Sequence, residues 1–329
     1  MKILFLGGAG MIGSAAAAEA AGRGHALTIV TRGEPRRALP AGVRQLRGDV
    51  YRPAELRAVL DAAGEGERYD AVVNWVGYTP AQLAGQAELF SSRTGQYVFI
   101  STCSVFARPV PSLPITESSP RRQPAFRYAR DKLACEEFLT AEYRASGFPL
   151  TIVRPAHVYD RTVVPVLAGW TAIERMRAGK PVIVHGDGTS LWTLMHSHDF
   201  ARAFAGLLGN GHAIGESVNV VSGDILSWDQ IHLALAEAAG ITRPVLAHRS
   251  SESIAREWPG WGDVLEHDFR HSMLFDNTKL RRLVPGFAPL MSFAAGAREI
   301  MAYHDADAGR RRIDDDLDAA FDRLRGEDN

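Results

Sequence analysis

The sequence predicts an α/β fold, in which a doubly wound parallel sheet is joined to a smaller C-terminal lobe. Three observations predict it. Short apolar runs alternate with helical stretches in the first half, a glycine-rich turn follows the first run, and the second half is less regular. Uniformly apolar strands are typical of a parallel sheet that helices cover on both faces. Right-handed crossovers then give a doubly wound sheet, in which ligands bind beyond the carboxyl ends of the strands.

The first half supplies the elements of this sheet. The expected strands span residues 3–6, 27–31, 43–46, 71–75, 97–101 and 150–153. The expected helices span residues 14–21, 53–63 and 126–146. Glycines mark two of the helix ends, because Gly22 and Gly24 follow the first helix and Gly147 follows the last.

The second half predicts a lobe that partly returns to the same sheet. Its expected helices span 163–179, 200–208 and 228–239, and its expected strands span 182–185 and 218–221. We therefore divide the chain into a domain over 1–156 and a lobe over 157–329, with about 182–222 partly rejoining the first sheet. The charge-dense tail, 306–329, predicts a helix that faces solvent or a partner.

Composition excludes several classes of function. The 329 residues carry 37 Lys+Arg against 38 Asp+Glu, so no global basic field would attract nucleic acid or an anionic membrane. Four glycines interrupt the apolar N-terminal stretch, and no later segment reaches the roughly 18 apolar residues of a membrane span. Two cysteines, Cys103 and Cys135, cannot build a disulfide framework. These features favour a reduced, cytoplasmic setting.

The glycine-rich turn GGAGMIG, at residues 7–13, predicts a dinucleotide site. Gly7 permits a tight turn at positive φ, Gly10 lets a pyrophosphate approach the backbone, and Gly13 lets helix and strand pack closely. The free N–H groups at the helix start would then face the phosphates. A merely tight turn is the alternative, but the turn lies between a strand and a helix at the very start of the fold, which favours the dinucleotide.

The second expected strand ends at Thr31-Arg32, where NAD sites place an acid for the ribose and NADP sites an arginine for the 2′-phosphate. Glu34 lies too far along, so Arg32 favours NADP(H) slightly over NAD(H). A solvated arginine is the alternative. Asp49, after the third strand, could accept from the adenine amino group or cap the next helix.

Tyr128 and Lys132 are four residues apart and therefore share one face of the long helix. A tyrosine with a pKa of about 10 is a poor base at neutral pH. A neighbouring ammonium favours the phenolate, so we expect Lys132 to lower the pKa of Tyr128. Three hydroxyls after the fifth strand, those of Ser101, Thr102 and Ser104, compete to hold the substrate oxygen.

These motifs together resemble the extended short-chain dehydrogenase/reductases, the NAD-dependent epimerase/dehydratase family, whose dinucleotide domain is of the Rossmann type. The matching segments are GGAGMIG (7–13), Gly48-Asp49, Val76-Gly77, STCSVF (101–106), Pro114 to Glu117, YARDK (128–132), Arg154-Pro155, GDG (186–188), His196 to Asp199 and Phe275 to Lys279. The resemblance implies that 1–156 binds NAD(P) and that 157–329 mainly binds substrate.

The resemblance also implies roles for single residues. Thr102, four residues before the aromatic Phe106, would position the reacting oxygen. Tyr128 would act as acid or base, and Lys132 would tune it and orient the ribose. The cofactor contacts implied are Gly7, Gly10, Met11, Ile12, Gly13, Arg32, Asp49, Val50, Val76, Gly77, Lys132 and Pro155.

Departures from the family pattern narrow the range of expected reactions and substrates. Dehydratases of the family carry Asp-Glu directly after the threonine, whereas this chain has Cys103-Ser104, so dehydration is disfavoured. Trp192 and His157 stand where nucleotide-sugar enzymes carry an arginine and an asparagine, which favours a substrate without a diphosphate or one held differently. We expect Thr102, Ser104, His157 and Trp192 to contact substrate; His157 in a loop and Trp192 in the core are the alternatives. Arg161 or Arg175 could take the place of the missing arginine.

The resulting hypothesis is a hydride-transfer enzyme that acts on a secondary alcohol or ketone of a sugar-like or nucleoside-like molecule. An epimerase would recycle its cofactor and a ketoreductase would exchange it; a ketoreductase of a non-sugar natural-product intermediate is an alternative. A non-catalytic or RNA-binding member of the fold is the alternative of another class. No metal site and no nucleic-acid or membrane partner is expected. Relatives dimerise through the helix that carries Tyr128, so we expect a homodimer, although Leu133, Phe138 and Leu139 equally suit burial in one chain.

Overall fold

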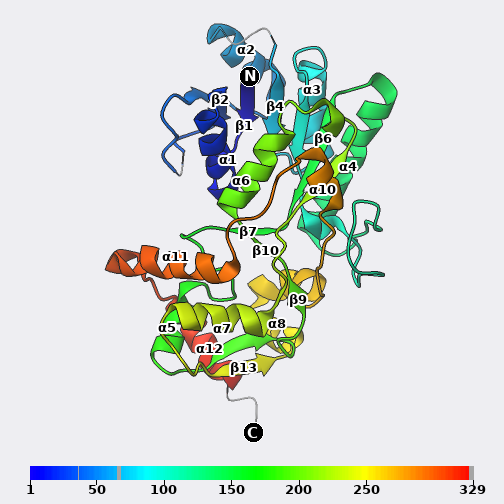
Figure 1. Cartoon of the computed structure of the whole chain (residues 1–329). Helices are drawn as coiled ribbons and strands as arrows, with labels where there is room; N and C mark the ends of the chain where they lie inside the picture. The colour runs from blue at the N-terminus through cyan, green and yellow to red at the C-terminus, as the bar shows by residue number, and fades with distance from the viewer. Residues whose placement is uncertain (36, 65–67, 326–329) are drawn as a thin grey trace.

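The computed structural model describes residues 1–35, 37–64 and 68–325, which form a larger lobe above a smaller one (Figure 1). The larger lobe contains a seven-stranded parallel sheet in the order β11-β6-β5-β4-β1-β2-β3, so the expected doubly wound sheet is confirmed. Its strands are β1 (Lys2–Leu6), β2 (Ala26–Thr31), β3 (Arg44–Arg47), β4 (Ala71–Asn74), β5 (Tyr97–Ile100), β6 (Leu150–Pro155) and β11 (Ser217–Val220).

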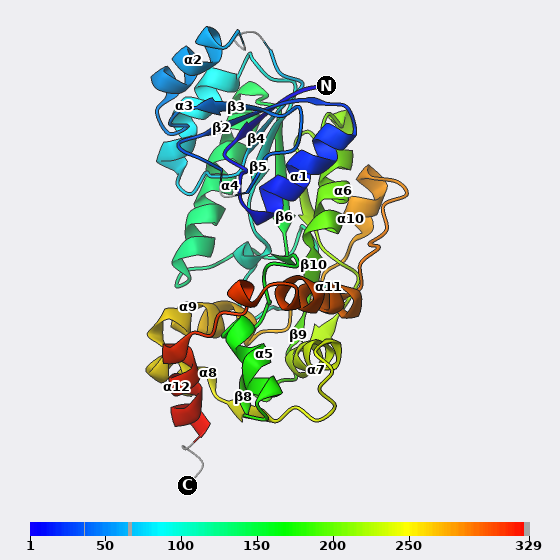
Figure 2. The same ribbon diagram turned by 90° about the vertical axis from the view of Figure 1, so that its left-hand side faces the viewer.

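Helices cover both faces of this sheet (Figure 2). One face carries α1 (Met11–Gly22) and α6 (Ser197–Leu207), and the other carries α2 (Pro53–Ala62), α3 (Pro80–Phe90) and α4 (Arg127–Ser146). Successive residues of a strand point to opposite faces, so Ile3 and Phe5 pack with the first pair of helices and Leu4 and Leu6 with the other three. Both faces of β1 are therefore buried, as its unbroken apolar sequence requires.

Helix α3 was absent from the expected elements. The chain carries a signal for it, because Thr79 and Gln82 form a capping box around Pro80 at the helix start. The apolar positions that follow are interrupted by Gly85 and by Gln86, which is buried and donates to the carbonyl of Val50. Burial of a polar side chain hides the apolar face that a sequence pattern would detect.

The smaller lobe is built from short strand pairs and helices. Its strands are β8 (Val182–His185) with β13 (Leu246–Arg249), and β9 (Leu191–Trp192) with β12 (Leu226–Ser227). A further pair consists of β7 (His157–Tyr159), which comes directly after β6 in the chain, and β10 (Leu194–His196). Its helices include α5 (Trp170–Arg177), α7 (Trp228–Ala238), α8 (Ser251–Glu257), α9 (Gly262–Val264), α11 (Phe293–Asp305) and α12 (Asp315–Arg325). Helix α10 (Thr278–Leu283) packs beside β11 on the larger lobe (Figure 1).

The range 182–222 is divided between the two lobes. Strand β8 pairs within the smaller lobe, whereas α6 and β11 belong to the large sheet and its covering layer. The expected helix 163–179 forms only from Trp170 onward. Residues 163–169 are a loop, because Pro165 offers no N–H and the turn passes through positive φ at Ala168 (65°) and Gly169 (53°).

The expectation that the tail faces solvent or a partner was wrong for α12. Leu317, Phe321 and Leu324 are buried against the smaller lobe. The buried guanidinium of Arg175 contacts Asp318 at 2.5 Å and Asp322 at 2.7 Å, which ties α12 to α5. Residues 326–329 lie outside the described part of the chain. Within the described part, no helix has both the length and the apolar character needed to cross a bilayer.

Candidate active site

The turn between β1 and α1, together with the first residues of α1, contains three glycines, Gly7, Gly8 and Gly13, that have no room for a side chain. Gly7 and Gly8 have φ of 76° and 88°, in the left-handed region. A Cβ on Gly7 would lie 2.5 Å from Val76 Cγ1, and one on Gly13 would lie 2.2 Å from the carbonyl oxygen of Gly8. A Cβ on Gly10, in contrast, would meet no described atom within 4 Å, because Gly10 faces open space.

A groove of about 450 Å³ lies over this turn. Its lining comes from residues 7–10, 30–34, 50–51, 76 and 78, so it includes Gly7, Gly10, Arg32, Val50 and Val76. Met11 and Ile12 begin α1 and pack partly buried against the core, which leaves their backbone N–H groups at the groove end of the helix. Main-chain donors at a helix N-terminus beside glycines without Cβ atoms fit the pyrophosphate of a dinucleotide.

Arg32 and Asp49 both contact Tyr51, the first at its ring and the second at its backbone N–H. The guanidinium of Arg32 is exposed and lies 5.6 Å from the centre of the Tyr51 ring, at the groove. Asp49 does not take the N-cap position of α2, which is Arg52. Its carboxylate accepts from the N–H of Tyr51 at 3.0 Å, and the Tyr51 hydroxyl donates to the carbonyl of Val76 at 2.7 Å. Asp49 therefore holds one side of the groove in shape.

The end of β5 separates the three competing hydroxyls. Ser101 is buried and lies outside the lining of any described cavity, whereas Thr102 and Ser104 line the cavity between the lobes. Thr102 is the N-cap of a short 3₁₀ turn, and its Oγ1 accepts from the N–H of Ser104 at 3.2 Å. The tight turn aims both hydroxyls at the same space.

Tyr128 lies in the first turn of α4 and lines the same cavity, with 42% of its surface exposed. Burial of the phenol among protein atoms raises the pKa of Tyr128 to about 12, and its interaction with the Thr102 hydroxyl acts in the opposite direction. The expected lowering of this pKa by Lys132 is therefore wrong for this arrangement. The physical reason is the position of the ammonium group, which is directed elsewhere.

Lys132 Nζ donates at 2.8 Å to the carbonyl of Gly77 and at 2.8 Å to that of Ile100. It is buried and lies over the rings of Tyr78 and Phe99, at 4.7 and 4.8 Å from their centres. Burial lowers the pKa of Lys132 to about 8. The ammonium thus joins the ends of β4 and β5, at the edge of the sheet that lies between the groove and the cavity.

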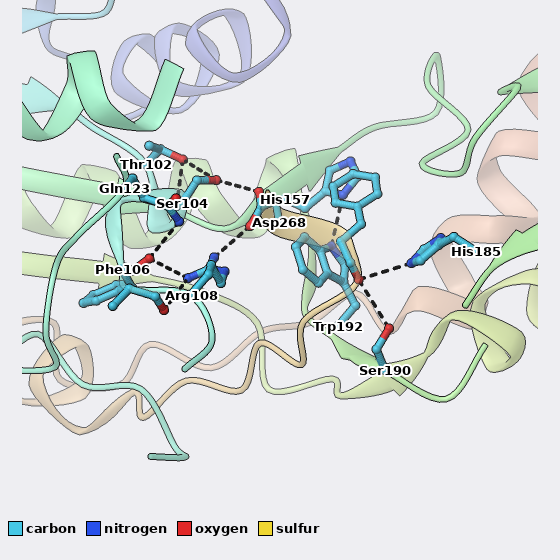
Figure 3. Close-up of polar contacts among 12 residues, drawn as sticks. Thr102, Ser104, Phe106, Arg108, Gln123, His157, His185, Ser190, Trp192 and Asp268 are labelled. Atoms are coloured by element: carbon cyan, nitrogen blue, oxygen red, sulfur yellow. Dashed lines mark hydrogen bonds and ion pairs between the residues drawn. The ribbon is translucent and has the colours of Figure 1, made fainter. Parts of the chain in front are cut away.

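The cavity between the lobes, which we call the catalytic cavity, has a volume of about 220 Å³. A carboxylate that sequence reasoning missed lies in its lining: Asp268, from the π-helical turn Leu265–Phe269 of the smaller lobe. Figure 3 shows its contacts, in which Oδ2 accepts from the hydroxyl of Ser104 at 2.8 Å and Oδ1 from Arg108 at 2.7 Å. Asp268 and Arg108 are both buried, so this ion pair joins the smaller lobe to the turn that carries Thr102.

Next to this network lies an aromatic wall made of His157, Trp192 and Phe269. Trp192 Nε1 donates to His157 Nδ1 at 3.1 Å, which assigns the remaining imidazole proton to Nε2 (Figure 3). The His157 and Phe269 rings are stacked, with centres 5.5 Å apart. Burial lowers the pKa of His157 to about 4, so the ring is neutral at pH 7. The two expected substrate residues, His157 and Trp192, therefore meet in one wall.

The remaining predicted residues are placed as follows. Pro155 lines the catalytic cavity at the end of β6, and Gly77 supplies a carbonyl to Lys132. Neither alternative arginine replaces the missing phosphate holder in the cavity lining. Arg175 is bound to α12, and Arg161 lies 5.3 Å from the ring centre of Tyr303. Among residues 1–35, 37–64 and 68–325, no group of three or more His, Cys, Asp or Glu side chains is arranged to hold a metal ion.

Curated relatives differ in their stated roles. The chain is 27% identical to 2'-dehydrokanamycin reductase of Streptomyces kanamyceticus, over 87% of this chain and 80% of that protein. It is 25% identical to the chloroplast stem-loop binding protein of 41 kDa b of Arabidopsis thaliana, over 98% of this chain and 83% of that protein.

Similarity to a solved structure gives the fold of the chain, and similarity to a family model gives its family. The structure of dTDP-glucose 4,6-dehydratase from Bacillus anthracis in complex with NAD has the same fold, with a TM-score of 0.75 at 16% identity over 94% of this chain and 98% of that chain. The model of the NAD dependent epimerase/dehydratase family matches residues 3–221. With the glycine turn, the seven-stranded sheet and the Thr102–Tyr128–Lys132 arrangement, this match shows that the chain belongs to the NAD dependent epimerase/dehydratase family.

Proposed function

We propose that the protein is a reductase that uses a nicotinamide dinucleotide to convert a ketone of a small hydroxylated molecule into an alcohol. One observation carries the proposal: the hydroxyls of Thr102 and Tyr128 line a single cavity next to the groove that fits a dinucleotide. The same residues would serve an epimerase, and the preference for net reduction rests on the relative that is named as a reductase.

Reduction of a ketone needs a proton donor at the carbonyl oxygen, whereas oxidation of an alcohol needs a base. Burial raises the pKa of Tyr128, and its phenol is protonated at neutral pH, as that of an ordinary tyrosine also is, so it can donate a proton to a carbonyl oxygen. The first of the two relatives described above is itself named as a reductase, and this name supports net reduction over epimerisation.

A bound nicotinamide would supply the hydride to the carbonyl carbon. Tyr128 donates its phenolic proton to the carbonyl oxygen, so the ketone gains one hydride and one proton and leaves as an alcohol. The Thr102 hydroxyl holds the same oxygen by a hydrogen bond. Lys132, fixed at the carbonyls of Gly77 and Ile100, holds the edge between the groove and the cavity in place.

The substrate that this cavity favours carries no diphosphate. Two charged side chains, Arg108 and Asp268, reach the cavity region, and each neutralises the other at 2.7 Å. The rest of the lining includes the aromatic wall of His157, Trp192 and Phe269. The His157 ring is neutral, and its Nε2–H can donate a hydrogen bond to a substrate. A dianionic group would find no unpaired cation among the described lining residues.

The exposed guanidinium of Arg32, at the end of β2, supports NADP(H) over NAD(H) as cofactor. A charge-assisted contact to a 2′-phosphate is worth about 1.5–3 kcal/mol, or roughly 10- to 100-fold in affinity. We expect Arg32→Ala to weaken NADPH by that factor while NADH changes little, as measured by quenching of protein fluorescence. Equal weakening of both cofactors would refute the role of Arg32.

The function is tested by following NADPH and NADH oxidation with a panel of cyclic and linear ketones, and with nucleotide sugars. We expect turnover of a ketone without a nucleotide and none with UDP-glucose. Isomerisation of a nucleotide sugar without net oxidation of cofactor would instead make the protein an epimerase.

RNA binding is the second candidate, because the relative from Arabidopsis is named for binding a stem-loop. The near-neutral net charge of −1 provides little of the electrostatic attraction that polyanions require. Retention of a labelled RNA stem-loop by the protein at 150 mM salt would favour this candidate, and loss of binding at modest salt would dismiss it.

A further inference from the structure

A second cavity adjoins the catalytic cavity on the far side of the aromatic wall. It has a volume of about 440 Å³, compared with about 220 Å³ for the catalytic cavity. We call it the side groove; its lining consists of residues 163–169 with Trp261, Val264, Leu317, His157 and Phe269. Three of these residues, His157, Val264 and Phe269, line both cavities. The stacked rings of His157 and Phe269 are therefore their common boundary.

The side groove is lined mainly by apolar side chains. Of the described residues that line it, none carries a charge at neutral pH: His157 is neutral, and the others are Val, Pro, Leu, Ala, Gly, Trp and Phe. Part of this surface meets solvent, since Val163 is 38% exposed and Trp261 and Val264 are half-buried, whereas Val164, Leu167 and Leu317 are buried. Contiguous apolar surface in contact with water is unfavourable, and it marks a place where an apolar group binds.

Contacts on both sides hold the groove open in one shape. Arg37 donates to Thr162 at 2.7 Å and pairs with Asp160, which fixes the start of loop 163–169. On the other side, Leu317 belongs to α12, which Arg175 ties to the body of the lobe. A preformed groove loses little conformational entropy when a ligand enters it.

We propose that the side groove binds an unbranched alkyl arm of the substrate, whose carbonyl end lies between Thr102 and Tyr128 in the catalytic cavity. This inference rests on the proposed reductase function and narrows its substrate to amphiphilic ketones. The shared lining places the groove directly beside the catalytic cavity, and the lack of charge in the groove favours an alkyl arm over a nucleotide, whose phosphates and base need polar partners.

The test uses the full chain and a series of linear 2-ketones from butanone to dodecan-2-one. Binding is measured by calorimetry with oxidised cofactor present, so that no turnover occurs. Each methylene buried in the groove is expected to raise affinity roughly three- to fourfold, until the groove is filled. Affinity that does not rise with chain length would overturn the proposal.

Two charged variants locate the arm. Val163→Glu and Val163→Lys are expected to weaken dodecan-2-one at least tenfold relative to butanone, because either charge would face the alkyl chain. Val245→Glu is the matched control, since Val245 is 49% exposed and lies outside the groove lining. Thermal unfolding of all three verifies the fold, and equal weakening by Val163→Glu and Val245→Glu would contradict the assignment.

The outcomes separate this inference from the proposed function. Ketones that bind more tightly with length but are never reduced with NADPH would uphold the groove and refute the reductase. Short ketones that are reduced while the binding series stays flat would uphold the reductase and refute the groove. A dimer in ultracentrifugation that Val163→Glu dissociates would assign the groove to a second copy of the chain and overturn the alkyl arm.

Discussion

The cofactor groove is formed largely by main chain, whereas the catalytic cavity is formed by side chains from both lobes. At the groove, Gly7 and Gly10 expose backbone beside the start of α1. In the cavity, Thr102 and Tyr128 of the larger lobe face Asp268 of the smaller one. The groove therefore depends on local backbone geometry and the cavity on how two lobes pack. A change in one should leave the other working, and this separation can be tested.

The largest expected effect is a loss of turnover when Tyr128 in the catalytic cavity is changed. Tyr128→Phe removes the proton donor, so we expect turnover of the ketone to fall by roughly 10²- to 10⁴-fold, while the Kd for NADPH stays within about threefold. Tyr143→Phe is the control, because Tyr143 lies on the same helix with 37% of its surface exposed. Retained activity in Tyr128→Phe would refute the mechanism.

The next largest effect is expected on stability, from the Arg108–Asp268 ion pair between the lobes. Arg108→Met leaves the buried carboxylate of Asp268 without its partner, which costs about 3–5 kcal/mol of unfolding free energy. The double variant Arg108→Met, Asp268→Leu removes both charges and should recover much of that loss. Urea unfolding measures both; a loss below about 1 kcal/mol in the single variant would mean that the pair does not join the lobes.

In the glycine turn of the groove, Gly13 and Gly10 differ in the space available for a side chain. Gly13→Ala would place a Cβ 2.2 Å from the Gly8 carbonyl, so we expect a destabilisation of about 1–3 kcal/mol and weaker binding of NADPH. Gly10→Ala meets no described atom within 4 Å and should leave the unfolding free energy nearly unchanged. Similar unfolding midpoints for the two variants would show that the turn tolerates side chains at either position.

The smallest effect is on the pH dependence of stability. Burial lowers the pKa of His157 and of His185 to about 4, below the value of about 6.5 expected when unfolded. Their contribution is complete above pH 6.5 and is lost as the pH falls towards 4, with a slope of up to about 1.4 kcal/mol per pH unit for each. His157→Gln should reduce the dependence of the unfolding free energy on pH between 6.5 and 4, whereas His198→Gln, at an exposed position, should not. An equal pH dependence of the unfolding free energy in the two variants would contradict the neutral aromatic wall.

The contrast between groove and cavity also explains what the sequence could predict. The parallel direction of the strands and the glycine turn follow from segments that are close in sequence, and the choice of Thr102 to meet Tyr128 follows from the family resemblance. The role of Gly13 could be inferred because a single contact with Gly8 decides it.

Asp268 and Phe269 could not be found in this way. They come from a short π-helical turn more than 160 residues after Ser104, and no motif marks them. The same limit applies to the side groove, because residues 163–169 were expected to be helical and α12 was expected to face solvent or a partner. Only the packing of the smaller lobe brings these segments together.

Helical spacing likewise gave only part of the relation between Tyr128 and Lys132. It placed both on one face of α4, but the direction of a long side chain depends on the acceptors around it. Two carbonyls, those of Gly77 and Ile100, hold the ammonium, whereas burial raises the pKa of the Tyr128 phenol.

Net transfer of hydride to a ketone is tested with NADPH that carries deuterium at both C4 positions of the dihydronicotinamide, so that either face delivers label. The protein is incubated with this cofactor and with a ketone that it turns over, and the alcohol is examined by mass spectrometry. We expect one deuterium in the alcohol for each cofactor oxidised, bound at the former carbonyl carbon. Product that contains no deuterium, or a substrate that isomerises while the cofactor remains reduced, would contradict it.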